Sequence, residues 1–217
     1  RLQVDWQALA QSHVNVNEVG ADALHIDLRS GPETPQPPSE PGPPEIPELP
    51  VTIDVQRLRL GRFSMTQDGV AVPLEVADLA ARLAADAHGA HLILENVRLQ
   101  GPDAQAVING SAHLGTQQPA AVKAAVVVDA RQGEYQARLD LHADGTLQDL
   151  TLTVAGAGHG MAVNADARLA PFSPTLPLHS LHARLRGFDP GAWVAGVPEA
   201  LLNVTADLQL AGALFEP

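Results

Sequence analysis

The sequence predicts an all-β protein, an elongated antiparallel β-meander with one apolar face and one polar face. Apolar and polar residues alternate with a period of two in about ten segments, as they do in half-buried strands. Glycine-containing turn signals separate most of these segments. Aromatic residues make up only 3% of a chain that is 45% hydrophobic, so its apolar surface consists mainly of Leu, Val and Ala side chains.

The alternating segments follow one another along the chain, and each is long enough for a strand. They are ALHIDLR at 23–29, VTIDV at 51–55, AVINGSAHL at 106–114, EYQARLDLHA at 134–143, LTLTV at 150–154, MAVNADARL at 161–169, SLHARLR at 180–186 and LLNVTADLQL at 201–210. Turn signals are found at 67–69, 87–90, 131–134, 143–145 and 157–160. Neighbouring segments are close enough to form hairpins, which predicts antiparallel pairing.

Three stretches interrupt the alternation. Residues 31–50 contain nine prolines and four glutamates and no basic residue, which indicates an extended loop or linker; a proline-rich ligand for a partner is the alternative. Residues 73–89 fit helical spacing after Pro73 and also fit a strand, so their periodicity leaves both open. In FDPGAWVAGVP at 188–198, the pair Asp189–Pro190 predicts a capped helical turn within a loop.

The composition excludes several classes of function. The net charge of −12 with no basic stripe argues against nucleic-acid binding and against an anionic membrane surface. The absence of cysteine excludes disulfides and thiolate metal sites. No apolar run reaches the ~18–20 residues that span a bilayer. The chain begins at Arg1 and ends after strand-like sequence, so we expect a piece of a longer protein.

We find no motif for catalysis, and we expect neither an enzyme nor a cofactor. None of the serines lies in a G-x-S-x-G elbow. His88 and His91 have the best spacing for a metal, but they flank a turn without nearby carboxylates, so we interpret them as solvated histidines. GAGHG at 156–160 is similar to a phosphate-binding loop, but strand-like rather than helical sequence follows it.

The apolar face is therefore the candidate functional surface. It can pack against a second sheet, close into a barrel, or form an open gutter, and patterning alone leaves these open. Its many alanines leave space, which suits an apolar guest; each buried methylene contributes about 0.8 kcal/mol. The candidate groove-lining residues are Leu24, Ile26, Leu28, Val51, Ile53, Val55, Ala106, Ile108, Leu114, Leu139, Leu141, Leu150, Leu152, Val154, Met161, Val163, Leu181, Leu185, Leu202, Val204, Leu208 and Leu210.

Several phrases of the chain, in this order, resemble the TamB family, which is related to AsmA-like and bridge-like lipid-transfer proteins. They are LQVDWQALAQSHVNVNEVGADALHIDL at 2–28, LPVTIDVQRLRLGRF at 49–63, ENVRLQGPDAQAVINGSAHLG at 95–115 and LRGFDPGAWVAGVPEALLNVTADLQLAG at 185–212. The resemblance is diffuse and covers nearly the whole chain. It implies a β-sheet curled lengthwise into a groove with an apolar interior, called a β-taco, and favours strand for residues 73–85.

The resemblance also implies a place and a role. Members are tethered to the inner membrane of Gram-negative bacteria and cross the periplasm, and another part of the chain meets the outer-membrane barrel protein TamA. The implied partners are phospholipid acyl chains and outer-membrane protein clients, including autotransporters. On this basis we expect residues 1–30 to end a preceding β-groove section, 31–50 to be the proline-rich connection, and 51–217 to form a continuing section of about nine to ten strands. The alternatives are a scaffold that accepts strands by augmentation, or a structural β-sandwich.

Overall fold

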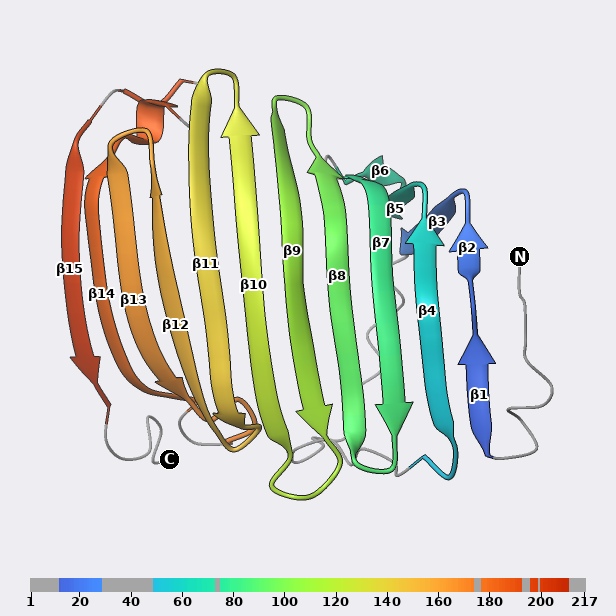
Figure 1. The fold of residues 1–217 in the computed structure, drawn as a ribbon. Coiled ribbons are helices and arrows are strands. Elements are labelled where there is room, and N and C mark those ends of the chain that lie inside the picture. The colour runs from blue at the N-terminus through green and yellow to red at the C-terminus, as the bar shows by residue number, and fades with distance from the viewer. Residues whose placement is uncertain are drawn as a thin grey trace.

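A computed structural model describes residues 12–28, 49–72, 75–173, 177–192, 196–198 and 200–210, and these form one 15-stranded sheet (Figure 1). The strands are β1 (His13–Val16), β2 (Val19–Ala21), β3 (Leu24–Leu28), β4 (Thr52–Leu60), β5 (Phe63–Gln67), β6 (Val70–Ala71), β7 (Glu75–Asp86), β8 (Gly89–Gln100), β9 (Ala104–Gly115), β10 (Ala121–Gln132), β11 (Tyr135–Thr146), β12 (Asp149–Gly158), β13 (Met161–Leu169), β14 (Leu178–Phe188) and β15 (Leu202–Gln209).

The main body is the predicted antiparallel meander. From β7 to β15 each strand pairs with its predecessor and its successor in the chain, and β4 pairs with β7. The sheet does not close, because β15 has only β14 beside it in the described part of the chain. Substantial contacts between elements join only strands that are neighbours in this sheet, so within the described ranges no second layer packs across it. The predicted all-β class is confirmed.

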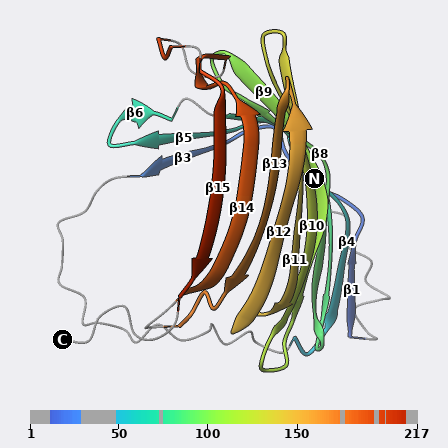
Figure 2. The same ribbon diagram turned by 90° about the vertical axis from the view of Figure 1, so that its left-hand side faces the viewer.

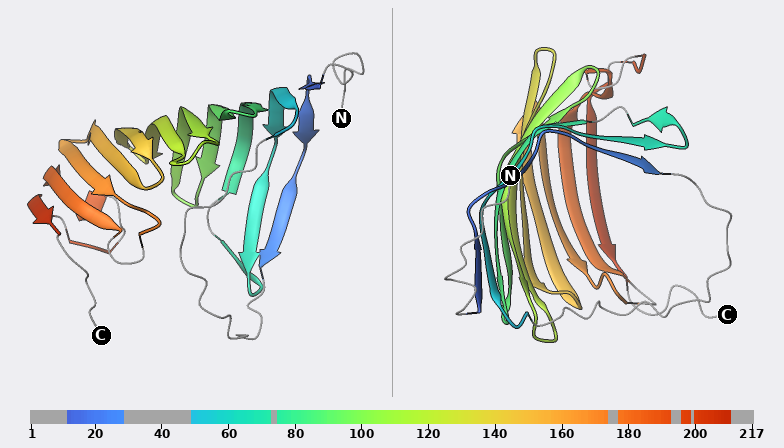
Figure 3. Two further views of the ribbon diagram at one scale, coloured as in Figure 1. Left: turned by 90° about the horizontal axis from the view of Figure 1, so that it is seen from below. Right: turned by 90° about the vertical axis from the view of Figure 1, so that its right-hand side faces the viewer.

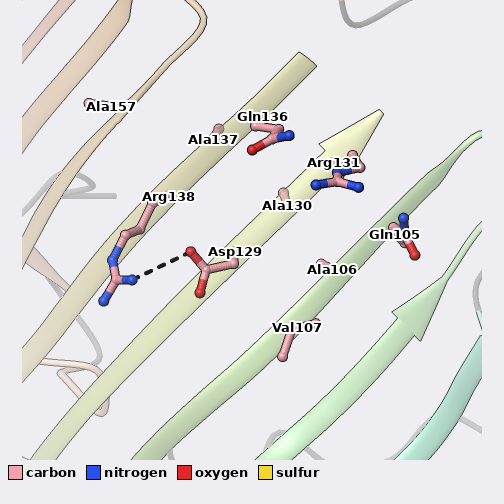
Figure 4. A pocket seen from close by; sticks show the side chains of 10 residues that line it. All are labelled: Gln105, Ala106, Val107, Asp129, Ala130, Arg131, Gln136, Ala137, Arg138 and Ala157. Carbon is pink, nitrogen blue, oxygen red and sulfur yellow. Dashed lines mark ion pairs between the residues drawn. The ribbon is translucent and has the colours of Figure 1, made fainter. Parts of the chain in front are cut away.

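The sheet is curved, and its two faces differ. In Figures 2 and 3 the strands bow toward one side, and β3, β5 and β6 project toward that same side. Figure 4, seen from the same side of the sheet as Figure 1, looks onto polar side chains of β9, β10 and β11. The apolar face therefore points to the opposite, hollow side. The open sheet forms a curled groove, as expected, and we call its apolar side the concave face and its polar side the outer face.

The N-terminal strands depart from the antiparallel expectation. β1 and β2 both pair in parallel with β4, and β3 pairs in parallel with β5. Residues 12–28 thus lie in the same sheet as the strands after residue 51. Parallel pairing needs a long connection between the paired strands. The proline-rich stretch lies in that connection, and residues 31–48 are outside the described part of the chain.

Strands β3, β5 and β6 form an arm that leaves the main sheet at a corner. β2 and β4 run side by side up to Ala21 and Leu60, and β3 and β5 continue them after the bend. Gly61 lies in this bend, where a Cβ atom would be only 2.7 Å from the backbone oxygen of Asp22. The close approach of the two chains at the corner therefore requires glycine.

Local predictions have mixed outcomes. Residues 75–85 are part of strand β7, which confirms strand over helix there; residues 73–74 are outside the described part. Pro190–Ala192 form a 3-10 turn whose predicted cap is confirmed, because Asp189 Oδ1 accepts from the Gly191 N–H at 3.0 Å. The turn predicted at 143–145 is wrong. Those residues continue β11, and the chain turns at Leu147–Gln148, where Thr146 Oγ1 accepts from two following N–H groups.

The apolar side chains do not form an ordinary core. In the described ranges no large side chain is fully buried, and the buried hydrophobic residues are small or medium in size. Those that lie in strands are all in β1, β4, β7 and β8; they are Val16, Val55, Ala81, Ala85 and Val97. A sandwich core would bury large residues along the whole sheet. None of the helical turns in the described ranges has the length and apolar character that crossing a membrane requires.

Candidate functional site

The strand registers place the predicted groove-lining residues on one face of the sheet. Directly paired residues in a sheet point their side chains to the same side. One such row crosses seven strands, from β9 to β15, and contains Ile108, Val128, Leu139, Gly156, Val163, Leu185 and Val204. A second row carries Leu152, Ala167, Leu181 and Leu208. The candidate residues of β9 and of β11 to β15 in these two rows therefore share one face of the sheet.

The concave face continues from the main sheet onto the arm formed by β3, β5 and β6. Leu24 pairs with Phe63 and Ile26 with Met65, while Phe63 itself pairs with Val76 of β7. Leu28 is next in the alternation. Ile53 and Val55 lie on this face of β4, opposite Ala85 and Leu83. Val51 and Leu210 lie just outside β4 and β15 and continue the alternation of those strands.

Sequence reasoning missed the contribution of three strands. In β7, β8 and β10 the residues on the concave face include Leu83, Leu92, Leu94, Val97, Leu99, Val122, Val126 and Val128. In β8 a register shift between Leu94 and Val97 moves the inward residues from even to odd numbers, which hides the period. In β10 the run AAVKAAVVV has apolar residues on both faces, with Lys123 as its one polar residue, so its period is masked.

The concave face carries no Asp, Glu, Lys or Arg across the described strands from β4 to β15. Every such residue in these strands falls on the outer face or at a strand end. Buried charges without partners are costly, and polar groups attract water. A face without charges along its whole length therefore suits an apolar ligand.

The concave face is also accessible in the described part of the chain. Leu202, Val204 and Leu208 of β15 are 42%, 50% and 44% exposed. Leu24, Ile26 and Leu28 on the arm are exposed as well. Exposed apolar surface of this extent marks a site for another molecule. Contact of the candidate residues with lipid is not tested by this geometry and stays a prediction.

The outer face carries the charges as scattered surface pairs. Arg168 donates to both carboxylate oxygens of Asp149, at 2.7 and 2.5 Å, and this bond lowers the pKa of Asp149. The same bond raises the pKa of Arg168. The His88 N–H, 2.7 Å away, is the main cause of a lowered pKa at Asp86, which also accepts from the Gly89 N–H.

Hollows on the outer face are open to solvent and lined by polar and charged side chains together with alanines. The hollow in Figure 4 has a volume of about 400 Å³ and is crossed by an ion pair between Arg138 and Asp129 at 3.6 Å. Gln105, Arg131 and Gln136 stand around it and face solvent. No base, nucleophile and acid converge there.

The histidines singled out in the sequence lie on the outer face or in turns. His88 is in the turn between β7 and β8, 3.7 Å from Asp86. His91 of β8 lies opposite His113 of β9, with ring centroids 6.4 Å apart. Within the ranges that the structure covers, no three His, Asp or Glu side chains are grouped to hold a metal ion.

The comparisons with known proteins give one match. A family model described as TamB, N-terminal domain, matches residues 49–184, which is more than half of the chain. The matched region runs from the start of β4 into β14 and so contains most of the concave face. No curated protein and no solved structure matches the chain.

Proposed function

The chain belongs to the TamB family, whose members act in outer-membrane biogenesis in the bacterial envelope, and on this premise we propose that its concave face conducts phospholipid acyl chains. We further propose a non-catalytic role in the periplasm of a Gram-negative bacterium, with the full-length protein tethered to the inner membrane. TamA is the proposed outer-membrane partner, through another part of that protein.

A single observation carries the lipid proposal: the concave face is apolar and free of Asp, Glu, Lys and Arg from β4 to β15. Acyl chains need no hydrogen bonds, so they can lie anywhere along such a surface and move along it. At about 0.8 kcal/mol per buried methylene, a sixteen-carbon chain gains on the order of 10 kcal/mol. Because the sheet is open on one side, the polar headgroup can stay in water while the acyl chain lies against the concave face.

Support for assembly of outer-membrane proteins, including autotransporters, is the second candidate function. The observation that favours it is the match to the TamB family model, whose members act in outer-membrane biogenesis, and client strands could pair with a strand edge of this sheet. The two functions use different parts of the molecule: lipid needs the side chains of the concave face, and a client strand needs the backbone of an edge. One protein can therefore support both.

Photo-crosslinking tests the lipid proposal. A benzoyl-phenylalanine replaces Leu208, which points to the concave face, or the adjacent Gln209, which points to the outer face, in cells grown with labelled phospholipid. We expect labelled lipid on the variant at position 208 and little on the variant at 209. No label at 208 in a folded protein would mean that protein fills the concave face. Equal labelling at both positions would indicate unspecific contact with membranes.

A further inference from the structure

Two histidines lie directly opposite each other on adjacent strands of the outer face. They are His91 of β8 and His113 of β9, which the register pairs and which are both exposed. Their ring centroids are 6.4 Å apart, and the ring planes are tilted by 58°. In the described part of the chain neither ring has a hydrogen-bond or ion-pair partner. The two imidazoles are therefore available to a ligand from solvent.

The backbone geometry brings these two side chains close together. The Thr116 N–H donates to the His88 carbonyl at 3.0 Å, which marks this pair as a hydrogen-bonded pair of the β8–β9 ladder. Hydrogen-bonded and non-hydrogen-bonded pairs alternate along antiparallel strands, so His91 and His113 form a non-hydrogen-bonded pair. In such pairs the Cβ atoms are only about 4.5–5.5 Å apart. Rotation of the two side chains can therefore bring one nitrogen of each ring to the same ion.

The neighbouring side chains leave room around the pair. Gly89 precedes His91 on the same face of β8, and a Cβ atom there would be only 3.1 Å from Cε1 of His113. The His113 ring thus lies over Gly89, in space that a larger residue would occupy. From β7, His91 is faced by the small side chain of Ala84. The space above the two rings is therefore open to an ion and its water ligands.

The charges around the pair favour a cation. The pKa of Asp86 is lowered mainly by the His88 N–H and, to a smaller degree, by the charge of His113, so this carboxylate lies within electrostatic reach of the pair. Lys123 faces His113 from β10 and opposes a cation, but its Nζ is 3.7 Å from Oδ2 of Asp144. Two carboxylates and one ammonium leave a net negative charge beside the rings, which attracts a metal ion.

We propose that His91 and His113 together bind a divalent transition-metal ion of the zinc, nickel and copper group. Neutral imidazole is a good ligand for these ions. Among the described residues no third His, Asp or Glu side chain is grouped with the pair, so water completes the coordination and the ion is exchangeable. The bound ion ties β8 to β9 beside the register shift between Leu94 and Val97, and so stabilises the sheet at its bend. This site is on the outer face and does not depend on lipid conduction.

Isothermal titration of the whole chain with zinc chloride tests the proposal. The key variants are His91→Asn and His113→Asn, each of which leaves one imidazole. His142→Asn is the matched control, because His142 lies on the outer face of β11 opposite Ala125 and Thr153, and neither of these offers an imidazole. Since two linked ligands hold an ion far more tightly than one, we expect each key variant to bind Zn²⁺ about a hundredfold more weakly than wild type. The control variant should bind as wild type does.

Thermal unfolding with and without Zn²⁺ gives a second readout. An ion that binds only the folded chain raises the melting temperature, and we expect this rise in wild type and His142→Asn but not in the two key variants. Three results would overturn the proposal. Equal binding by wild type and His113→Asn would mean that the two rings only contact each other. Loss of binding in His88→Asn but not in His91→Asn would assign the ion to the turn, where His88 is 3.7 Å from Asp86. The same rise in melting temperature in every variant would place the ion elsewhere.

Discussion

The sheet consists of two regions built from the same alternating pattern with different results. From β1 to β8 the strands shift register at several points, three pairs are parallel, and Val16, Val55, Ala81 and Val97 are buried. From β9 to β13 the hairpins stay in register along their full lengths, and further on β15 leaves its apolar side chains exposed. The first region bends on itself, while the second stays open.

Register shifts on three adjacent strands accompany the bend of the first region, whereas the second region has shifts only at β13–β14 and β14–β15. Bulges bend and twist strands, and those in β4, β7 and β8 lie on neighbouring strands at the end where the arm departs. The bend brings side chains on the concave face together and buries them there. From β9 to β13, where the register is regular, the strands do not bend over one another. Nothing in the described part of the chain covers the concave face there. The N-terminal region thus stabilises the sheet, and the C-terminal region presents the surface.

The largest expected effect comes from placing a charge in each region. Val97 is 6% exposed and Leu208 is 44% exposed, yet both lie on the concave face. Val97→Asp buries a carboxylate without a partner and should lower the free energy of unfolding by on the order of 3 kcal/mol or more. Leu208→Asp should unfold the sheet only modestly but abolish lipid occupancy. Thermal unfolding by circular dichroism and lipid detection by native mass spectrometry measure the two effects.

The controls for this pair are Val97→Ala and Leu208→Ala, which shorten the side chain without adding charge. Equal loss of stability in the two Asp variants would contradict the division into a stabilising and a presenting region. Retained lipid in folded Leu208→Asp would instead argue against the concave face as the lipid site.

An intermediate loss of stability is expected from two asparagines, one in each region, whose side chains accept a hydrogen bond from the backbone of a β-bulge. Asn109 Oδ1 accepts from the Asn96 N–H at 2.8 Å, and Asn203 Oδ1 accepts from the Gly187 N–H at 3.0 Å. Both donors have positive φ and sit where the register shifts. Asn109→Ala and Asn203→Ala should each lower the free energy of unfolding by about 1 kcal/mol. Urea titration measures this loss.

Asn164→Ala is the matched control, because Asn164 lies on the outer face of β13 where the register is regular. We expect almost no change in its free energy of unfolding. A loss at Asn109 without a loss at Asn203 would show that the bulge matters only in the bent region.

The smallest effects concern one carboxylate in each region. The pKa of Asp86 is lowered mainly by the His88 backbone N–H, and that of Asp149 mainly by the bond from Arg168. A lowered pKa stabilises the fold above the unfolded-state value of about 3.9, and this contribution is lost as the pH falls through the folded-state value. In Asp86→Asn and in Asp149→Asn, the melting temperature should therefore fall slightly less than in wild type when the pH is lowered. Thermal unfolding at a series of pH values measures this change.

Salt distinguishes the two sites. The exposed Asp149–Arg168 pair is screened by added salt, whereas the hydrogen bonds that Asp86 accepts from the backbone of its turn are screened less. We expect the difference in melting temperature between wild type and Asp149→Asn to shrink in 1 M sodium chloride. The difference between wild type and Asp86→Asn should persist. The same salt dependence at both sites would contradict these assigned causes.

Much of the candidate site could be predicted from the sequence. Alternation assigned Leu139, Val163 and Leu208 to one face before any pairing was known, because side chains of a strand point to opposite sides whatever its neighbours are. It failed at Val97, where an extra residue reverses the parity, and in β10, where both faces are apolar. The turn predicted at 143–145 was wrong because Gly145 is accommodated within the strand, with a φ of 135° beside Asp149.

The sequence by itself determined the all-β class and, outside β7, β8 and β10, which residues lie on each of the two faces and the absence of charge on one of them, since each depends only on the local period of two. The tertiary structure decided the parallel pairing of β1, β2 and β3, the corner at Gly61 and the hollow of the sheet. These features depend on which distant strands meet and in what register. Side-chain alternation is the same for every choice of neighbour, so it carries no information about them.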